Sequence, residues 1–166
     1  MKKKIILLGI TLFLLIGCSM SNTPTSKVED LLSKYQRLDA DISNGIDSVL
    51  EEQNLTDTHK ERYRKLLENQ YKNMSYEVKE EKIDGNNAIV TVEIEVLDYK
   101  NAINDLLFDS TIYTKESYDE EKLNRLESTT GKVKYTIDLS LTKDKDDNWN
   151  LDALTNEQIK KIQGMF

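Results

Sequence analysis

The only cysteine of the 166-residue chain, Cys18, stands directly after an apolar run and is followed by small polar residues. The run extends from Ile5 to Ile16, three lysines precede it, and Gly17 separates it from the cysteine. A basic start, a short apolar segment and a small residue before a cut point are together typical of a secretory signal. As a helix the run would span about 18 Å, whereas a bilayer core needs about 30 Å. We therefore expect a cleaved signal, and a short uncleaved membrane anchor is the alternative.

The tetrapeptide Leu15-Ile16-Gly17-Cys18 resembles the lipobox of bacterial lipoproteins, in which Leu, a small or branched residue and Gly or Ala precede the cysteine. The resemblance implies that a diacylglyceryl group is joined to the Cys18 sulfur and that the signal, residues 1–17, is cut between Gly17 and Cys18. The two acyl chains of this group anchor a protein stably in a membrane, whereas a single chain binds only marginally. The implied location is the extracytoplasmic face of the cell membrane, held there by the lipid on Cys18.

The type of cell follows from composition. The chain has 19 Lys against 4 Arg and only 4 Ala, which indicates an AT-rich genome and a Gram-positive-type cell. In a Gram-negative cell the same signal, with Ser19 after the cysteine, would lead to the outer membrane.

Removal of the signal changes the charge and the redox chemistry of what remains. The formal net charge goes from −7 to −10, because residues 1–17 contribute three lysines and no acid. An acidic domain is repelled by nucleic acid and by anionic head groups, so we expect no nucleic-acid partner. Once Cys18 is acylated, no thiol is left for a disulfide or a thiolate metal site. The acidic charge is compatible with a cationic partner, such as a metal ion or a basic peptide, and this alternative is left open.

One short acidic pattern suggests calcium binding. Asp144-x-Asp146-x-Asn148 has the first three ligand spacings of a calcium loop, which also needs Gly at its sixth position and Glu at its twelfth. Those positions are Trp149 and Thr155. We interpret the segment as a solvated turn between strands, with weak cation binding as the alternative. No glycine-rich phosphate loop or G-x-S-x-G sequence is present, and we expect no cofactor and no resident metal.

The helices and strands of the domain can be predicted from the periodicity of its apolar residues. Residues 18–26 form a short polar tether, and residues 27–166 suit a single domain. Apolar side chains at helical spacing predict a helix capped by Ser26-x-x-Glu29, a break at Asn44-Gly45, and a third helix from Thr56 or Thr58.

The apolar period then changes from 3.6 to 2, which predicts two hairpins. The first has strands near 74–83 and 88–96 with a turn at 84–87, and the second has strands near 133–141 and 149–151 with a turn at 143–148. Between them lie helical segments, one capped by Ser117-x-x-Glu120, and Thr155-x-x-Gln158 caps a last helix. The expected fold class is α+β: N-terminal helices packed on a curved antiparallel sheet of about four strands, with a helical insertion at about 100–127 between the two hairpins.

This order of elements supports a resemblance. The helical opening, the hairpin from Lys82 to Val92 and the segment Trp149-Asn150-Leu151-Asp152 resemble NTF2-like (cystatin-like) domains. More narrowly, they resemble the small uncharacterised lipoproteins of Gram-positive bacteria that carry such a domain, and the closing residues from Ile162 to Phe166 resemble the ends of some of these chains. The insertion at about 100–127 departs from the simple form of this fold, which leaves the strand order and the shape of any pocket open.

Two sets of side chains in the predicted domain could form a site. His59 is the only histidine, and enzymes similar to this fold use an Asp–His or Tyr–Asp arrangement for acid–base chemistry, but no matching motif is present. We expect His59 to be an ordinary first-turn or partly exposed histidine. Five tyrosines near the strands and the insertion could fill the core or line an amphipathic pocket between sheet and insertion: Tyr76, Tyr99, Tyr113, Tyr118 and Tyr135.

Three functions are consistent with these features. A membrane-tethered, non-enzymatic module that binds an unknown protein, peptide or small ligand agrees with the lipobox, the single domain and the missing catalytic set. The alternative is a small hydrolase or isomerase with a pocket near His59. A solute-binding component of a transporter is disfavoured, because such proteins usually need two lobes and a longer chain.

Overall fold

The computed structural model describes residues 22–52 and 55–166, and the predicted signal, Gly17 and Cys18 lie outside these residues. The described part contains six helices and four strands, and its fold class is α+β, as the sequence predicts. The helices are α1 (Pro24–Arg37), α2 (Ala40–Glu52), α3 (Asp57–Lys72), α4 (Tyr99–Ala102), α5 (Lys115–Glu127) and α6 (Asn156–Ile162). The strands are β1 (Ser75–Asp84), β2 (Asn87–Leu97), β3 (Lys132–Lys143) and β4 (Trp149–Leu151).

The four strands form one antiparallel sheet in the order β1-β2-β3-β4. Alternate residues of β2 point to the core, and Val90, Val92 and Ile94 are fully buried. On the opposite face, Glu93 and Glu95 pair with lysines of β3 at 2.9 and 3.1 Å. The period-2 pattern of the sequence therefore corresponds to a sheet with one apolar face and one charged face.

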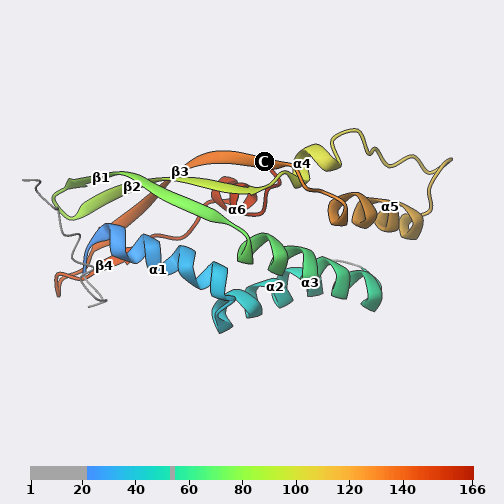
Figure 1. Ribbon diagram of the computed structural model, residues 1–166. Helices are drawn as coiled ribbons and strands as arrows, with labels where there is room; N and C mark the ends of the chain where they lie inside the picture. Colours follow the sequence, from blue (N-terminus) through green and yellow to red (C-terminus); the bar gives the residue numbers. More distant parts are fainter. Residues whose placement is uncertain (1–21, 53–54) are drawn as a thin grey trace, which may run out of the picture.

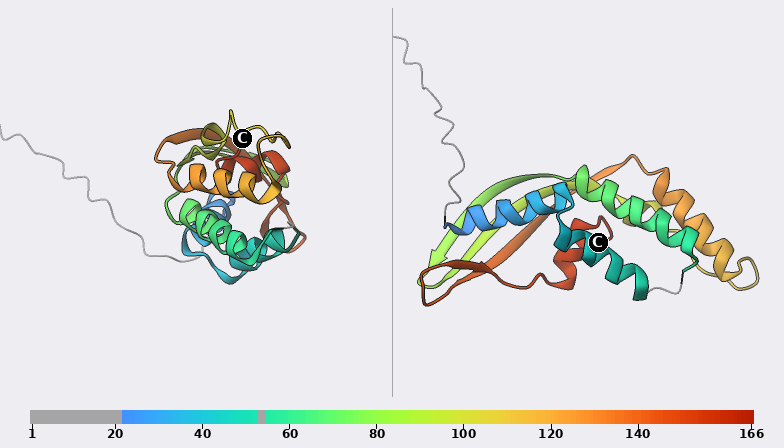
Figure 2. Two further views of the ribbon diagram at one scale, coloured as in Figure 1. Left: turned by 90° about the vertical axis from the view of Figure 1, so that its right-hand side faces the viewer. Right: turned by 90° about the horizontal axis from the view of Figure 1, so that it is seen from below.

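Helices cover the apolar face and one edge of the curved sheet (Figures 1 and 2). Helix α1 packs against β1, β2 and β4 and buries Val28 and Leu32 completely. Helix α6 covers β3 where β4 has ended: Gln158 Nε2 donates to the Asp138 carbonyl at 2.5 Å, and Lys161 Nζ donates to the Thr136 carbonyl at 3.3 Å. These contacts satisfy backbone groups of an edge that would otherwise be open to another strand.

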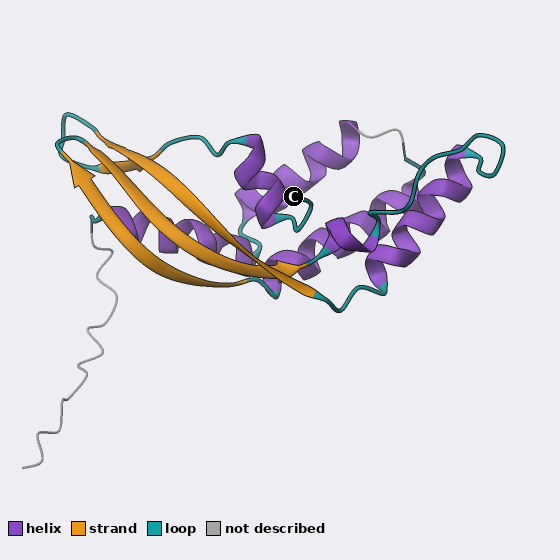
Figure 3. Cartoon of the chain, turned by 90° about the horizontal axis from the view of Figure 1, so that it is seen from above, coloured by secondary structure: helices purple, strands orange, loops and turns teal. Residues whose placement is uncertain are grey.

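The insertion between β2 and β3 extends the molecule beyond the sheet. Helix α5 packs alongside α3 and buries Leu123 and Leu126 against Leu66 and Tyr99, a second apolar cluster apart from the one under the sheet. The strand turns 84–87 and 144–148 lie at one end of the elongated molecule, and the loop 103–114 lies at the other (Figure 3). Residues from α2, α3, α5 and the C-terminal segment meet between these two ends.

The first two helices divide at a place that the sequence does not reveal. We expected the break at Asn44-Gly45, but these residues lie inside α2, so that prediction is wrong. Helix α1 ends at Arg37, and the residue that caps it, Leu38, has a φ of 54° in the left-handed region. Its N–H donates to carbonyls of the last turn of α1, and this bonding satisfies the helix end without a glycine.

Two of the predicted helix starts are three residues too late. The N-cap of α1 is Thr23 with Ser26 at N3, and Pro24 occupies the first turn, where its fixed φ and missing N–H cost nothing. The N-cap of α5 is likewise Thr114 with Ser117 at N3. In both cases the serine that we assigned as the cap is the reciprocal partner inside the helix. The predicted cap Thr155 is confirmed, and of the two starts that we considered for the third helix, Thr56 is the N-cap of α3.

Candidate functional site

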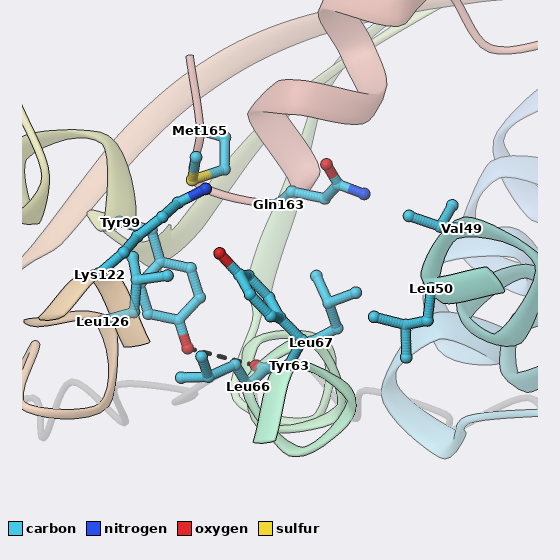
Figure 4. A pocket seen from close by; sticks show the side chains of 10 residues that line it. All are labelled: Val49, Leu50, Tyr63, Leu66, Leu67, Tyr99, Lys122, Leu126, Gln163 and Met165. Carbon is cyan, nitrogen blue, oxygen red and sulfur yellow. Dashed lines mark hydrogen bonds between the residues drawn. The ribbon is translucent and has the colours of Figure 1, made fainter. Parts of the chain in front are cut away.

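An apolar cavity of about 140 Å³, which we call the central cavity, lies between the helices and the C-terminal segment (Figure 4). It is walled by side chains of α2, α3, α5, the start of α4 and residues after α6. The lining residues are Val49, Leu50, Tyr63, Leu66, Leu67, Tyr99, Lys122, Leu126, Gln163 and Met165. Seven of these ten side chains are aliphatic or thioether groups or buried tyrosine, so the interior favours an apolar occupant.

A second hollow of about 220 Å³, the adjoining cavity, begins on the other side of Leu67. The two cavities share Val49, Leu67 and Gln163 in their walls. The adjoining cavity also contains the rings of Tyr35 and Tyr71, which meet edge to face at 4.9 Å. Burial raises the pKa of both hydroxyls, that of Tyr35 to about 12, so both rings are neutral at physiological pH. The two rings therefore bring no negative charge to the adjoining cavity.

Polar groups of the central cavity gather on one side. The Lys122 ammonium lies 5.5 Å from the centroid of the Tyr63 ring. Figure 4 shows the Lys122 chain beside that ring, with its Nζ and the Tyr63 hydroxyl on the same side of the cavity. The hydroxyl of Tyr99, by contrast, is used inside the fold, because it donates to the Leu66 carbonyl at 3.2 Å. The cavity thus has an apolar body and a polar end.

A close backbone approach fixes the wall formed by the C-terminal segment. Gly164 has a φ of 67°, and a Cβ at this position would overlap the Leu97 carbonyl and the Gln70 side chain. Its carbonyl accepts a hydrogen bond from the Lys100 N–H at 2.8 Å. Glycine is required here both for the left-handed backbone and for the space. The chain is thereby held so that Met165 faces the cavity.

The structure places His59 in the interior between α3 and α5. The residue is only 5 % exposed, so of the two positions that we considered, first-turn or partly exposed, the second does not apply, and its Nε2 lies 3.1 Å from a Glu120 carboxylate oxygen. As predicted, it stands in the first turn of its helix, where its N–H donates to the Thr56 hydroxyl. His59 is not among the residues that line the central cavity. The predicted alternative of a pocket built around His59 therefore lacks support from this cavity.

Arg62 determines the surroundings of that histidine. Its guanidinium donates to both oxygens of Glu120 at 2.8 Å, to Glu127 at 2.7 and 2.8 Å, and to Asn124 at 2.8 Å. Hydrogen bonds from Arg62 lower the pKa of Glu120 and of Glu127 below the ordinary value of a glutamate. A carboxylate held ionised in this way is a poor proton acceptor, so the cluster is built to join α3 to α5.

The acidic segment before Trp149 is a turn between β3 and β4, as we expected. One oxygen of Asp144 accepts hydrogen bonds from the N–H groups of Asp146 and Asn148, each at 2.9 Å, and the other accepts from Asn150 Nδ2 at 3.0 Å. The carboxylate organises its own loop. Across residues 22–51 and 55–166, no group of three or more His, Cys, Asp or Glu side chains is arranged to hold a metal ion.

Of the five tyrosines that we considered for a pocket, only Tyr99 lines the central cavity. Tyr135 donates to the Phe166 carbonyl at 2.9 Å, and Tyr113 and Tyr118 pack edge to face in the insertion. The cavity itself lies among α2, α3, α5 and the C-terminal segment, not between sheet and insertion. Sequence reasoning missed Tyr63 and Lys122, because their separation of 59 positions along the chain gives no local signal.

The far end of the molecule carries apolar side chains in water. Leu107, Phe108 and Ile112 are 77 %, 54 % and 70 % exposed in the loop that joins α4 to α5. Phe108 contacts the Tyr118 ring at a centroid distance of 5.4 Å, which gives the loop a partial support. Nothing in the described residues covers this loop tip.

Comparisons of the chain with protein-family models, with curated proteins and with solved structures find no match. Among the described residues, no helix combines the length and the apolar composition needed to cross a bilayer. The functional argument consequently depends on the geometry of the chain itself.

Proposed function

We propose that this protein is a lipid-anchored binding module of the extracytoplasmic membrane face and that the central cavity is its binding site. The observation that supports the proposal is the cavity of about 140 Å³, apolar within and polar at one end. Small-molecule sites are usually hollows lined by apolar and aromatic side chains, with a few polar groups that orient the ligand. The proposed lipid on Cys18 and the NTF2-like character of the domain are parts of the same proposal.

The position of the first described residues is consistent with a tether at one end. Asn22 donates to the Asp147 carbonyl at 2.8 Å, and its side-chain oxygen accepts from the Trp149 N–H at 3.0 Å. The chain coming from Cys18 therefore joins the folded part at the β3–β4 turn. The acidic charge of the chain would keep the domain off anionic head groups. On this proposal, the cavity is accessible from the aqueous side.

A small hydrolase or isomerase is the second candidate, and the contact between the buried His59 and the half-exposed Glu120 is the observation that favours it. A histidine beside a carboxylate is a common acid–base arrangement. Here, however, the carboxylate is engaged by Arg62, and His59 is not part of the cavity wall. We therefore favour binding without chemistry.

The proposal can be tested with a variant that fills the cavity. Leu67 lines both cavities, and Leu67→Trp would occupy their shared wall. The processed lipoprotein and this variant are purified from membranes in the same detergent, after incubation with an extract of the culture medium and cells. Mass spectrometry then compares the small molecules that each retains.

We expect the wild-type protein to retain a compound that Leu67→Trp loses. Leu107→Trp is the matched control, because it adds the same indole at a site that is 77 % exposed and distant from the cavity. Repeated retention of nothing by the wild-type protein, or equal retention by Leu67→Trp, would contradict the proposal.

A further inference from the structure

We infer that the ligand of the central cavity is a small amphipathic anion, with an apolar body about the size of one aromatic ring and a carboxylate that binds at Lys122 and Tyr63. This inference rests on the proposed function, because it assigns a ligand class to the same cavity. Three properties of the wall support it: the charge at its polar end, the donors there, and the volume behind them.

Lys122 supplies the charge. Within residues 22–51 and 55–166 it forms no ion pair, although the two residues that precede it on α5, Glu120 and Glu121, each pair with an arginine. The Lys122 ammonium instead lies over the Tyr63 ring, beside an apolar surface. A positive charge next to low-dielectric walls attracts an anion more strongly than the same charge in open water. The chain has net charge −7, so a cationic wall group without a carboxylate partner points to an anionic ligand.

Tyr63 supplies a second donor. Its hydroxyl lies on the same side of the cavity as Lys122 Nζ (Figure 4). An ammonium and a phenolic O–H can both donate to one carboxylate, which has two oxygens and about four lone-pair sites. Hydrogen bonds between a donor and an ionised acceptor are shorter and about twice as strong as neutral ones. The polar end therefore matches a carboxylate better than an alcohol or an amine.

The volume limits the apolar body. An apolar cavity of about 150 Å³ stays dry and accepts benzene. The central cavity, with about 140 Å³, has nearly this size. A longer body would have to pass Leu67 and Val49 to enter the adjoining cavity. Aryl carboxylates and short-chain fatty acids share the required chemistry, and the experiment below separates them.

Three probes of equal ring size test the charge preference. They are 4-fluorobenzoate, 4-fluorobenzyl alcohol and 4-fluorobenzylammonium, and their ¹⁹F relaxation reports binding to the processed lipoprotein in detergent micelles. Comparison of variants in the same detergent cancels partitioning into the micelles. Hexanoate is added as a competitor, so displacement of 4-fluorobenzoate shows whether an aliphatic acid uses the same site.

We expect the carboxylate to bind at least about tenfold more tightly than the ammonium, as a charge-assisted hydrogen bond would provide. Lys122→Gln should weaken the binding of 4-fluorobenzoate by about tenfold and change the dissociation constant of 4-fluorobenzyl alcohol by less than about twofold. Lys122→Arg, which keeps the charge, should restore most of the carboxylate affinity. Thermal unfolding should change little in both variants, because Lys122 forms no ion pair within the described residues and Lys122→Gln removes only a partly exposed contact with the Tyr63 ring.

The outcomes separate this inference from the proposed function. The inference of an anionic ligand would be overturned by equal binding of the three probes, by no binding of 4-fluorobenzoate, or by an unchanged affinity for 4-fluorobenzoate in Lys122→Gln. If Leu67→Trp still abolishes retention of a cellular compound in that case, the cavity remains the binding site and only its ligand class is wrong. If the wild-type protein also retains no compound that Leu67→Trp loses, both the anionic ligand and the proposed function are wrong.

Discussion

The side chain of Gln70 forms two hydrogen bonds with the backbone of Leu97, each 2.9 Å long. Its Nε2 donates to the Leu97 carbonyl, and its Oε1 accepts from the Leu97 N–H. Leu97 lies beyond the last residue of β2 that pairs with β1, so the amide of a helix side chain substitutes for the missing strand. Gln70 is fully buried, and the pair joins α3 to the end of the sheet beside the central cavity.

Gln70→Leu should destabilise the protein by about 2 to 4 kcal/mol, because two buried backbone groups lose their partners. The measurement is urea unfolding followed by circular dichroism. Lys72→Leu, an exposed position on the same helix, is the control and should change the free energy of unfolding by less than about 0.5 kcal/mol. A loss of similar size in both variants would contradict the role of the Gln70–Leu97 pair.

Gly164→Ala should displace the C-terminal segment and cost more than about 2 kcal/mol of stability, since it combines a left-handed backbone with a steric overlap. Weaker binding at the central cavity should accompany the loss, because Met165 lines it. Gly131→Ala is the matched control: its added Cβ meets no atom within 4 Å. Unfolding midpoints and retention of ligand measure both effects. A Gly164→Ala variant as stable as wild type would show that the close approach to Leu97 is not required.

The contacts of Arg62 predict a pH dependence of stability. Its hydrogen bonds lower the pKa of Glu120 and Glu127 in the folded protein relative to the unfolded chain. The folded state therefore binds fewer protons there, and its stabilisation is complete above the unfolded value of about 4.3 and is lost as the pH falls through the lowered values. Arg62→Gln should reduce stability at pH 7 and flatten the acid limb of the curve. The measurement is the free energy of unfolding as a function of pH. Parallel curves for wild type and Arg62→Gln between pH 7 and pH 3 would contradict this account.

His59→Gln distinguishes binding from catalysis. His59 contacts Glu120 and is absent from the wall of the central cavity, so the variant should bind 4-fluorobenzoate with a dissociation constant within about twofold of wild type. Some loss of thermal stability should occur, because the polar contact of a buried side chain is altered. A large loss of affinity without unfolding would favour the second candidate function, with a site near His59.

Cys18→Ala tests the proposed anchor. The variant should accumulate as an uncleaved precursor that takes up no labelled fatty acid and still folds beyond residue 27, because removal of the thiol leaves no atom for acylation. Gel mobility, labelling and mass spectrometry of the intact chain measure this. Normal processing and lipid labelling of Cys18→Ala would show that the lipobox interpretation is wrong.

The sheet could be predicted from the sequence because its signals are local. Alternation from Ala88 to Val96 and the polar turn at 84–87 determine the first hairpin, and both appear in the structure. The cap of α1 at Leu38 could not be predicted, because a leucine in the left-handed region gives no sequence signal. The caps Thr23 and Thr114 carried a readable pattern, a threonine three residues before a serine, which we assigned one turn too late.

The candidate site was not predictable in the same way. Leu50, Tyr63, Lys122 and Met165 come from four separate segments, and each is unremarkable within its own helix or tail. Only the packing of α5 on α3, and the approach of Gly164 to Leu97, bring them around one space. A single sequence contains no period or spacing that encodes such a meeting of distant residues.

The most direct test of the central claim, that the central cavity is the binding site for a small ligand, is a crystal structure with a heavy-atom probe. Crystals of wild type and of Leu67→Trp are soaked in 4-bromobenzoate or 4-bromobenzyl alcohol, and the anomalous signal of bromine is measured. We predict a bromine peak between Leu67 and Tyr99 in the wild-type protein and none there in the variant. Bromine bound only outside the cavity, or at no site with either probe, would contradict the account.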